Sequence, residues 1–333
     1  MDESISLDYG SGGKKTAALI REMILPAFGN PVLSQLGDGA VLPDPGQMVF
    51  STDSFVISPL FFPGGNIGKL AVCGTVNDVA MAGGIPLYLS FSLVIEECFS
   101  TEALRRILEA AGEEAGKAHV HIVTGDTKVV EKGSCDGLFI NTAGIGRLAA
   151  PDLGPGRLSE GDRILVSGPL GDHGISILLA REPQLLSGGV RSDCANIAPL
   201  AAALFSLGAD LKLLRDPTRG GAATVLAELT EDQPLGFELA ERDLPFSSDT
   251  LAACELLGLD PLYSANEGKL IAIVSEAKAE EALRLLRAFP EGEKACCIGR
   301  VTAEHPGSCI LRTRLGGSRV LKALSGAQFP RIC

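Results

Sequence analysis

Residues 101–118, TEALRRILEAAGEEAGKA, form the clearest helical pattern in the chain. Apolar side chains recur there at intervals of three and four residues, which places them on one stripe of a helix. The stripe consists of Leu104, Ile107, Leu108, Ala111 and Ala115. Ser100 and Thr101 are candidate N-caps. Strand-like runs surround this helix at 48–57, 86–95, 119–124 and 137–146, so the alternating patterns predict a fold of the α/β or α+β class.

The stretch PDLGPGRLSEGDR, from Pro151 to Arg163, is the best candidate for a domain boundary. It is rich in Pro, Gly and charged residues, and an apolar strand pattern follows it. A chain of 333 residues also exceeds the size of one ordinary core. We therefore predict domains over 1–151 and 152–315. The second domain is predicted to have helices near 172–181, 194–207, 219–230 and 277–288 and strands near 163–167, 269–275 and 297–302.

The last segment, GGSRVLKALSGAQFPRIC over 316–333, opens with two glycines and ends in Cys333. This composition predicts a mobile arm. The sixteen steps from Gly317 to Cys333 span about 50 Å when extended, so the arm could reach an active site in its own subunit or in a partner. A terminal cysteine in isolation is often incidental, but an accessible thiol on such an arm is a candidate reactive group.

Composition excludes several classes of function. The net charge of −12 argues against a nucleic-acid partner, because binding phosphate backbones requires clustered Lys and Arg. No apolar run approaches the length of a membrane span. The nine cysteines are scattered without a C-x-x-C pair, and the acidic start MDESISLDYG does not resemble a signal peptide. We therefore expect a cytoplasmic protein that binds neither nucleic acid nor a membrane.

Two Gly-rich stretches that lead into helical patterns are candidate phosphate sites. The first comprises Gly10, Ser11, Gly12, Gly13 and Lys14, although its spacing is not that of a Walker A motif. The second is RDPTRGG over 215–221, where Thr218 and Arg219 precede the helix. Glycines let the backbone approach phosphate oxygens, and a helix N-terminus offers free N–H groups. The alternative for the first stretch is a flexible loop.

Four aspartates in the first half stand next to small or polar residues: Asp38, Asp53, Asp78 and Asp126. Asn77 precedes Asp78. Mg²⁺ prefers oxygen ligands such as these and retains water. Any single aspartate in such a turn is more often a cap or turn former. Together the four predict a magnesium site, although spacing alone does not show that they converge.

Lys128 and Glu267 are candidate proton-transfer groups. Lys128 follows Gly125 and Asp126 at the end of a strand-like run, and Glu267 precedes an apolar strand pattern. A lysine acts as a base near neutral pH only where burial or neighbouring cations lower its pKa. The alternatives are a solvated lysine and an ordinary turn carboxylate.

The order of several motifs resembles that of the HypE family. These are the carbamoyl dehydratases of [NiFe]-hydrogenase maturation, within the AIR synthase (PurM-like) superfamily. The resemblance covers essentially the whole chain. It is carried by PLFFPGGNIGKLAVCGTVNDVAMAGG, VTGDTKVV, INTAGIG, GDHG, SDCA, LRDPTRGG, ANEGKL and the terminal PRIC.

The resemblance implies a fold and a reaction. The fold has a mostly β N-terminal domain that pairs with a second copy into a barrel-like homodimer, followed by an α/β domain. A HypF-type carbamoyltransferase places a carbamoyl group on Cys333, and ATP then activates the carbamoyl oxygen by phosphorylation. Loss of phosphate leaves a thiocyanate, whose cyano group passes to iron held by a HypC–HypD complex.

The resemblance also implies residue roles. Lys128 and Glu267 match the family residues for deprotonation. Asp53, Asp78 and Asp126 match its nucleotide and magnesium carboxylates, and Gly10 to Gly13 match its phosphate loop. Asp38 is carried over as a further carboxylate, although Gly39 stands where many superfamily members have a second aspartate.

Other functions compete with this interpretation. A selenophosphate synthetase is expected to carry a cysteine near the N-terminal glycines, but the first cysteine here is Cys73. A thiamine-phosphate kinase has no need of a terminal cysteine. From a different class, a non-catalytic carrier could present Cys333 to partner enzymes, but a carrier needs no nucleotide site.

Overall fold

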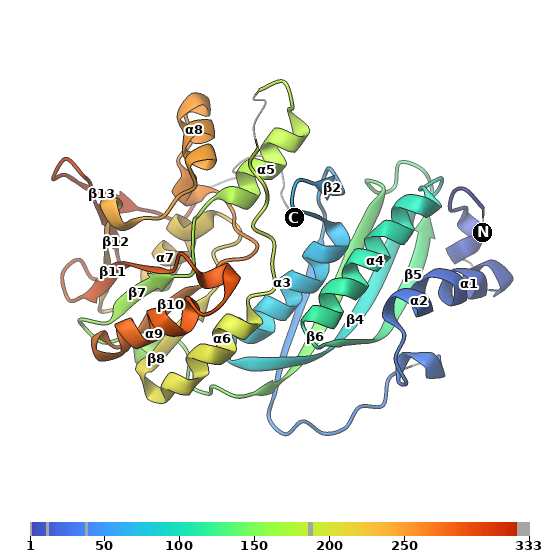
Figure 1. The fold of residues 1–333 in the computed structure, drawn as a ribbon, viewed down its shortest axis with the longest axis horizontal. Helices are drawn as coiled ribbons and strands as arrows, with labels where there is room; N and C mark the ends of the chain where they lie inside the picture. The colour runs from blue at the N-terminus through green and yellow to red at the C-terminus, as the bar shows by residue number, and fades with distance from the viewer. Residues whose placement is uncertain (1, 11–12, 37–38, 186–188, 325–333) are drawn as a thin grey trace.

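The computed structural model describes residues 2–10, 13–36, 39–185 and 189–324 (Figure 1). Two sheets with their own helices lie on opposite sides of a junction formed largely by helix α3 (Ile67–Met81). Four of the predicted site residues lie outside the described residues: Ser11, Gly12, Asp38 and Cys333.

The N-terminal sheet has four strands in the order β1-β6-β4-β5. The strands are β1 (Met48–Phe55), β6 (Leu138–Leu148), β4 (Gly84–Glu96) and β5 (His121–Val130). Strands β4 and β5 are parallel, and the other two pairs are antiparallel. The free edges are therefore β1 and β5. A small hairpin of β2 (Phe61–Phe62) and β3 (Gly65–Asn66) precedes α3.

Helices α3 and α4 (Thr101–Lys117) lie across one face of this sheet (Figure 1). All five residues of the predicted stripe on α4 are buried, and Ser100 is its N-cap, accepting a bond from the N–H of Ala103 at 3.3 Å. Helix α3 is buried nearly all round, between the sheet, α4 and the second domain. Asn66 caps it through the backbone N–H groups of Gly68 and Lys69.

The other face of the sheet carries no helix from the described part of the chain; we call it the open face. Alternation along the strands assigns to it Phe50, Thr52, Ser54, Tyr88, Ser92, Val94, Asp126, Lys128, Phe139, Asn141 and Ile145. Phe50 is 67% exposed, and the apolar members on β4 and β6 are half-buried. The open face thus mixes exposed apolar and polar side chains.

The N-terminal segment covers the β5 edge. It consists of η1 (Leu7–Gly10), α1 (Gly13–Leu19), η2 (Ile20–Ile24), α2 (Leu25–Phe28) and η3 (Leu33–Gln35). Gly10 lies directly against β5, where a Cβ would come within 2.5 Å of the backbone nitrogen of Val129. Only glycine allows this approach, which places the start of the Gly-rich loop beside Asp126 and Lys128.

The C-terminal sheet has seven strands in the order β13-β12-β9-β11-β7-β10-β8. They are β7 (Arg163–Val166), β8 (Leu211–Arg215), β9 (Gly236–Ala240), β10 (Ile271–Val274), β11 (Cys296–Thr302), β12 (Cys309–Arg312) and β13 (Ser318–Leu321). Its helices are α5 (Asp172–Arg181), α6 (Ala198–Leu204), α7 (Gly221–Thr230), α8 (Ser248–Leu257) and α9 (Ala279–Leu286). One apolar core packs α7 on the sheet, and another packs α6 and α9 on it.

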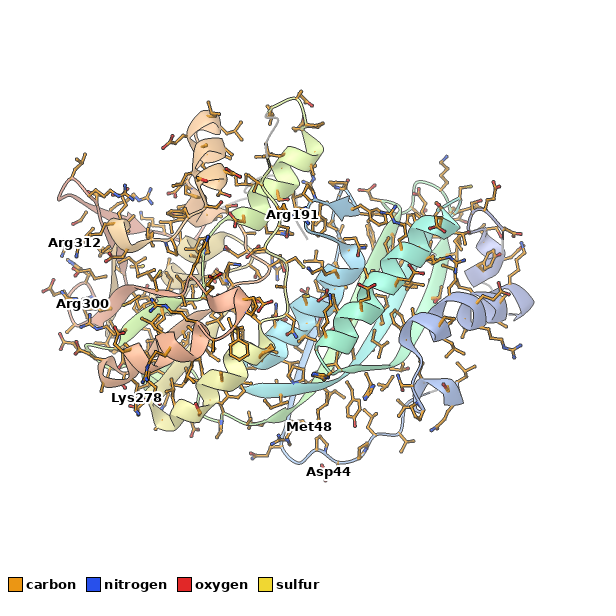
Figure 2. The ribbon with its side chains drawn as sticks, in the orientation of Figure 1. Asp44, Met48, Arg191, Lys278, Arg300 and Arg312 are labelled. Atoms are coloured by element: carbon orange, nitrogen blue, oxygen red, sulfur yellow. The ribbon has the colours of Figure 1, made fainter. Side chains whose placement is uncertain are left out.

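Far from the junction, Arg300 of β11 and Arg312 of β12 both bond to Glu238 of β9 (Figure 2). These are ordinary surface ion pairs and mark no site. None of the helices in the described ranges is long and apolar enough to cross a membrane.

The segment 192–197 joins the two domains. The N–H of Ser192 bonds to the carbonyl of Pro63 at 2.8 Å, and Cys194 lies buried beside Cys73 of α3. Helix α6, which follows this segment, packs on α3. The junction is therefore built on one face of α3.

The structure also differs from the sequence prediction. Helix α3 was not predicted, because its buried residues lie all round it and leave no single apolar stripe of the kind that reveals an amphipathic helix. Strands β8 and β9 and helix α8 were also missed. The prediction of a mobile arm from residue 316 is wrong for 318–321, which form β13 on β12, with Leu321 buried. The end of the predicted arm, 325–333, lies outside the described residues.

Candidate functional site

The predicted site residues fall into two groups at opposite edges of the N-terminal sheet. Asp53 and Asp78 lie at the β1 edge beside the domain junction, whereas Asp126 and Lys128 lie on β5. Three strand spacings separate these edges, about 14 Å. The two groups also use opposite faces, because Asp53 is in register with Thr142, Phe91 and Gly125, whereas Asp126 is in register with Ser92, Asn141 and Ser54.

Asp78 sits in the last turn of α3, facing β1. Its carboxylate accepts a hydrogen bond from the hydroxyl of Ser51 at 3.0 Å. Asp53 follows Ser51 by two residues and therefore points to the same face of the sheet. Burial raises the pKa of Asp78, and the negative charge of Asp53 raises it further. The sequence prediction that these two carboxylates belong together is thus consistent with the fold.

Two carboxyl groups of the second domain face this pair. Asp216 follows β8 and Glu267 precedes β10, and their side chains are 6% and 5% exposed. Their loops are joined, because the backbone N–H and the side-chain amide of Asn266 both donate to the carbonyl of Pro217. We call Asp53, Asp78, Asp216 and Glu267 the acidic cluster.

Electrostatic repulsion marks the acidic cluster. Burial, and then the charge of Asp78, raises the pKa of Asp216 to about 6. Burial raises the pKa of Glu267 well above its usual range, with further contributions from Asp216 and Asp193. Arg215 offsets part of this charge at Asp78 and Asp216. Carboxyl groups gathered in this way are costly unless a cation or a proton joins them.

The chemistry of these donors suits Mg²⁺, which prefers carboxylate oxygens. Among the described residues, no three Asp, Glu, His or Cys side chains are close enough to form a metal site by themselves. Mg²⁺ commonly retains water and shares its coordination with substrate phosphates, so one or two carboxylates suffice. Asp78 and Asp53 fit that requirement.

Asn77, a predicted cofactor-binding residue, has a different environment. Its side-chain N–H donates to the carbonyl of Ala195 at 3.0 Å, and its oxygen accepts from the N–H of Ile197 at 2.9 Å. Only 2% of Asn77 is exposed. Its amide thus joins the two domains and is engaged by protein groups at both ends.

Thr218 and Arg219 belong to the turn that leads into α7. The N–H of Gly221 bonds to the carbonyl of Thr218, and Gly220 is the N-cap in a left-handed conformation. Arg219 is exposed, and its positive charge acts on Asp78. This turn therefore adds a cation at the rim of the acidic cluster.

Asp126 and Lys128 form an ion pair on the open face, with 2.8 Å between the Lys128 nitrogen and Oδ2 of Asp126. Both side chains are about 60% exposed, at 59% and 62%. The hydrogen bond from Lys128 lowers the pKa of Asp126, and the N–H of Thr127 lowers it further. This is a solvated pair without the burial of the acidic cluster.

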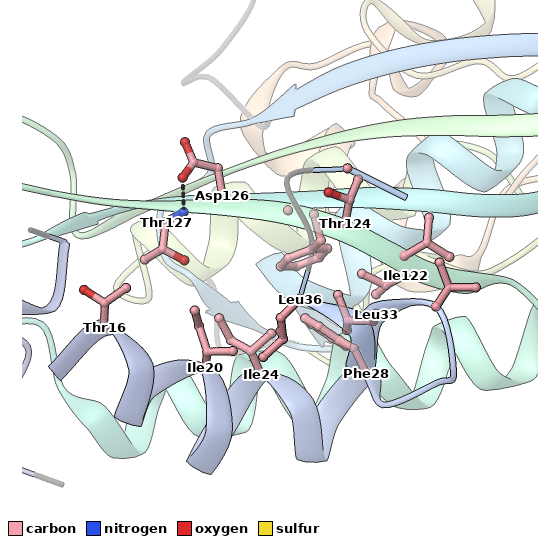
Figure 3. Close-up of a pocket in the computed structure, with 15 residues that line it drawn as sticks. Thr16, Ile20, Ile24, Phe28, Leu33, Leu36, Ile122, Thr124, Asp126 and Thr127 are labelled. Atoms are coloured by element: carbon pink, nitrogen blue, oxygen red, sulfur yellow. Dashed lines mark hydrogen bonds between the residues drawn. The ribbon is translucent and has the colours of Figure 1, made fainter. Parts of the chain in front are cut away.

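A pocket of about 250 Å³ lies between the N-terminal helical segment and β5 (Figure 3). Apolar side chains of Ile20, Ile24 and Phe28 point into it from one side, and Ile122 lines the other. Thr16 and Thr127 stand nearer the polar end, while Asp126 points away from the helices. The pocket is apolar within and polar at one end, as a site for a planar aromatic group would be.

Sequence reasoning missed three residues of the site: Asp193, Asp216 and Lys269. Asp216 belongs to the RDPTRGG stretch, in which only Thr218 and Arg219 were predicted to contact phosphate. Asp193 and Lys269 form an ion pair with 3.3 Å between Oδ2 and Nζ, and both side chains are largely buried. A buried, paired charge is recognised only from the structure.

Comparisons with known proteins identify both domains. Residues 36–148 match the family model of the AIR synthase related protein N-terminal domain, and residues 159–312 match that of its C-terminal domain. The carbamoyl dehydratase HypE of Bradyrhizobium diazoefficiens is 48% identical over 332 residues, which are 99% of this chain and 96% of the relative.

Solved structures give the same result. A crystal structure of the hydrogenase maturation protein HypE in complex with ATP matches at a TM-score of 0.95 and 45% identity, covering 99% of this chain and all of that one. A structure of a HypE–HypF complex matches at 0.80 and 43% identity, covering 92% of this chain and 99% of that one.

The fold and the two matched domains make this chain a member of the AIR synthase-related (PurM-like) proteins, as the sequence resemblance predicted. Within that class the chain belongs to the HypE family of carbamoyl dehydratases, enzymes of hydrogenase maturation.

Proposed function

We propose that this enzyme uses ATP to dehydrate a carbamoyl group on its own Cys333 to a thiocyanate, which supplies cyanide ligands for the iron of [NiFe]-hydrogenase. The observation that carries the proposal is the acidic cluster, four carboxyl groups from two domains gathered at the domain junction, two of them buried. Family membership supplies the reaction class.

The reaction converts S–C(=O)NH₂ into S–C≡N. The carbamoyl oxygen attacks the γ-phosphorus of ATP, ADP leaves, and one N–H proton is lost. The C–O bond then breaks to release phosphate, and the second N–H proton is lost. Two proton acceptors are thus required, and a buried carboxylate with a raised pKa such as Glu267 is suited to this work. Lys128, which is exposed and paired with Asp126 in a single subunit, is proposed as the other acceptor where a second copy covers it.

We propose that Asp53 and Asp78 hold Mg²⁺ together with nucleotide phosphates. The ion would offset the charge that develops on the transferred phosphoryl group. Thr218 and Arg219, at the start of α7, face the same junction and are proposed phosphate contacts. Asp126 is retained as a proposed nucleotide or metal contact at the β5 edge, and Asp38 as a proposed carboxylate.

We propose that the pocket beside β5 binds the adenine ring. HypE has been solved with ATP, and this chain matches that structure over nearly its whole length. The apolar interior of the pocket suits the ring. Gly10 ends η1, and Gly13 and Lys14 begin α1, the helix that borders the pocket. Phosphates near the helix start would be favoured by its free N–H groups.

We further propose a homodimer through the open face. Half-buried Tyr88 and Val94 and exposed Phe50 give that face the apolar area that a second copy would cover. A two-fold axis along the strands would set the β1 edge of one copy near the β5 edge of the other. The acidic cluster and the Asp126–Lys128 pair would then belong to one composite site.

Partners follow from the family. HypE has been solved with HypF, and we propose a HypF-type carbamoyltransferase as the donor of the carbamoyl group. A HypC–HypD complex that carries iron is proposed as the acceptor. The cysteines of the described residues are all free thiols, which suits a reducing compartment, and we propose a cytoplasmic location.

The mass of the C-terminal peptide tests the reaction. The protein is incubated with the carbamoylating partner, carbamoyl phosphate and Mg-ATP, and ATP is withheld from a matched sample. Loss of one water from carbamoylated Cys333 only with ATP supports dehydration. A carbamoyl adduct that survives ATP contradicts it and favours the carrier alternative.

Mixed dimers test the composite site. Asp78→Asn and Lys128→Ala are each expected to be inactive alone. If each site takes Asp78 from one subunit and Lys128 from the other, random mixing restores about a quarter of the unsubstituted activity. If each site lies within one subunit, no activity returns, and the two-subunit arrangement is withdrawn.

A further inference from the structure

The carboxylate of Asp193 binds two successive backbone N–H groups of the loop that carries Glu267. Its Oδ1 accepts the backbone N–H of Glu267 at 3.1 Å, and its Oδ2 accepts that of Gly268 at 3.2 Å. Lys269 pairs with the same carboxylate at 3.3 Å. The Asp193 side chain is only 3% exposed, so these bonds are shielded from water.

The contact between the two loops is as close as the backbone permits. A Cβ on Gly268 would come within 1.9 Å of the carbonyl oxygen of Asp193, which only glycine avoids. The N–H of Ala195 returns a bond to the carbonyl of Glu267 at 3.2 Å. The segment 193–195 therefore bonds to both the backbone N–H and the carbonyl of Glu267.

That segment is in turn fixed to the N-terminal domain beside the acidic cluster. Asn77, the neighbour of Asp78, bonds to the carbonyl of Ala195 and to the N–H of Ile197. A continuous chain of hydrogen bonds thus runs from the end of α3 through residues 193–197 to Glu267. It sets the position of the Glu267 carboxyl relative to Asp78.

We infer that Asp193 is a positioning residue for the dehydration: it orients Glu267 toward the substrate without touching the substrate itself. The inference rests on the proposed role of Glu267. A buried carboxylate that already accepts two backbone N–H groups and pairs with a lysine is engaged by protein groups and is well placed to hold a loop.

The test is a double-mutant cycle of Asp193→Asn and Glu267→Gln, read as the single-turnover rate of water loss from carbamoylated Cys333. We expect Asp193→Asn alone to slow this step by about tenfold or more, because small misplacements of a reacting group are costly. The Kd for ATP should stay within about twofold. In the Glu267→Gln background, Asp193→Asn should add little further slowing.

The control is Asp162→Asn, another buried carboxylate (4% exposed) that accepts a backbone N–H, from Ser159, away from the site. It should leave the rate unchanged. A readout independent of activity is hydrogen exchange of the Glu267 and Gly268 amides, which should rise in Asp193→Asn and not in Asp162→Asn.

The outcomes separate the inference from the proposed function. The positioning role alone is overturned if the two factors of slowing multiply in the double variant. It is also overturned if the Asp193→Asn protein is as fast as the unsubstituted one. A normal rate for Glu267→Gln removes Glu267 from the mechanism and the inference with it. Absence of water loss in the unsubstituted protein overturns the proposed function, and again the inference with it.

Discussion

The acidic cluster and the Asp126–Lys128 pair contain the same kinds of charge in opposite settings. In the cluster, Asp216 and Glu267 are buried and Asp53 and Asp78 are half-buried, and burial and repulsion raise the pKa values of Asp78, Asp216 and Glu267. At β5, one aspartate meets one lysine in solvent, and the pairing lowers the pKa of Asp126. The acidic cluster lowers the free energy of unfolding, whereas the exposed ion pair changes it little.

This difference separates a site from a surface. A buried group of like charges persists only where function requires it, because folding alone would favour fewer charges. An exposed ion pair carries no such implication. Within a single chain, the domain junction is therefore the stronger indication of a functional site. The β5 edge is a candidate because the pocket and the open face lie beside it.

The largest expected effect comes from Asp78→Asn, which removes one charge from the cluster. We expect the rate of ATP-dependent water loss to fall by about a hundredfold or more, since a metal carboxylate contributes several kcal/mol to charge stabilisation. Rapid-quench mass measurements of the C-terminal peptide follow the rate. Ser51→Ala, which deletes only the hydrogen bond to Asp78, is the matched control and should cost less than about tenfold. Equal rates for Asp78→Asn and the unsubstituted protein would remove Asp78 from the site.

The second prediction concerns stability and pH at Asp216. Its pKa rises from 3.8 in the unfolded chain to about 6 in the folded one, so between these values the folded state holds the proton longer. Stability is therefore lost as pH rises through this window, by about 3 kcal/mol relative to Asp216→Asn. Urea unfolding at pH 4 and pH 7.5 measures the difference.

Asp126→Asn is the control for this experiment, because the pKa of Asp126 is lowered and its side chain is exposed. Asp126→Asn should change the pH dependence of the unfolding free energy only slightly and in the opposite direction. At pH 7.5, Mg²⁺ is expected to reduce the difference in unfolding free energy between the unsubstituted protein and Asp216→Asn. If the unfolding free energies of those two proteins change in parallel with pH, the cluster does not raise the pKa of Asp216.

The third prediction addresses the β5 edge through Gly10→Ala. The new methyl group meets the backbone nitrogen of Val129 and must push the Gly-rich loop away from β5. We expect a loss of about 1–3 kcal/mol in unfolding free energy and weaker ATP binding by calorimetry. Gly116→Ala, in α4 with open space around its Cβ, should be neutral or slightly stabilising. Unchanged ATP affinity in Gly10→Ala would separate the loop from the nucleotide site.

The smallest effect on stability is expected for Lys128→Met. The ion pair with Asp126 is exposed, so the unfolding free energy should change by less than about 1 kcal/mol, and the change should shrink in high salt. Chemical denaturation at two salt concentrations measures it. A loss of several kcal/mol would place Lys128 in a buried network and contradict the comparison between the two regions.

Several features could be read from the sequence because they depend on local patterns. The apolar stripe of α4 and its Ser100 cap were predicted, and both are present. Helix α3 was not, because its core contacts surround it and leave no polar face to create a period. The helix that carries Asp78 was thus among those that periodicity did not detect.

By itself the sequence determined the class of fold, the family and the types of residue from which the site is made, since motif order and hydrophobic period are properties of the chain. Only the tertiary structure decided which of those residues meet. Strand order and side-chain alternation put Asp53 and Asp126 on opposite edges and faces of one sheet. The domain junction added Asp193, Asp216 and Lys269. Proximity between carboxylates depends on register and packing across long stretches of chain, and no local pattern records it.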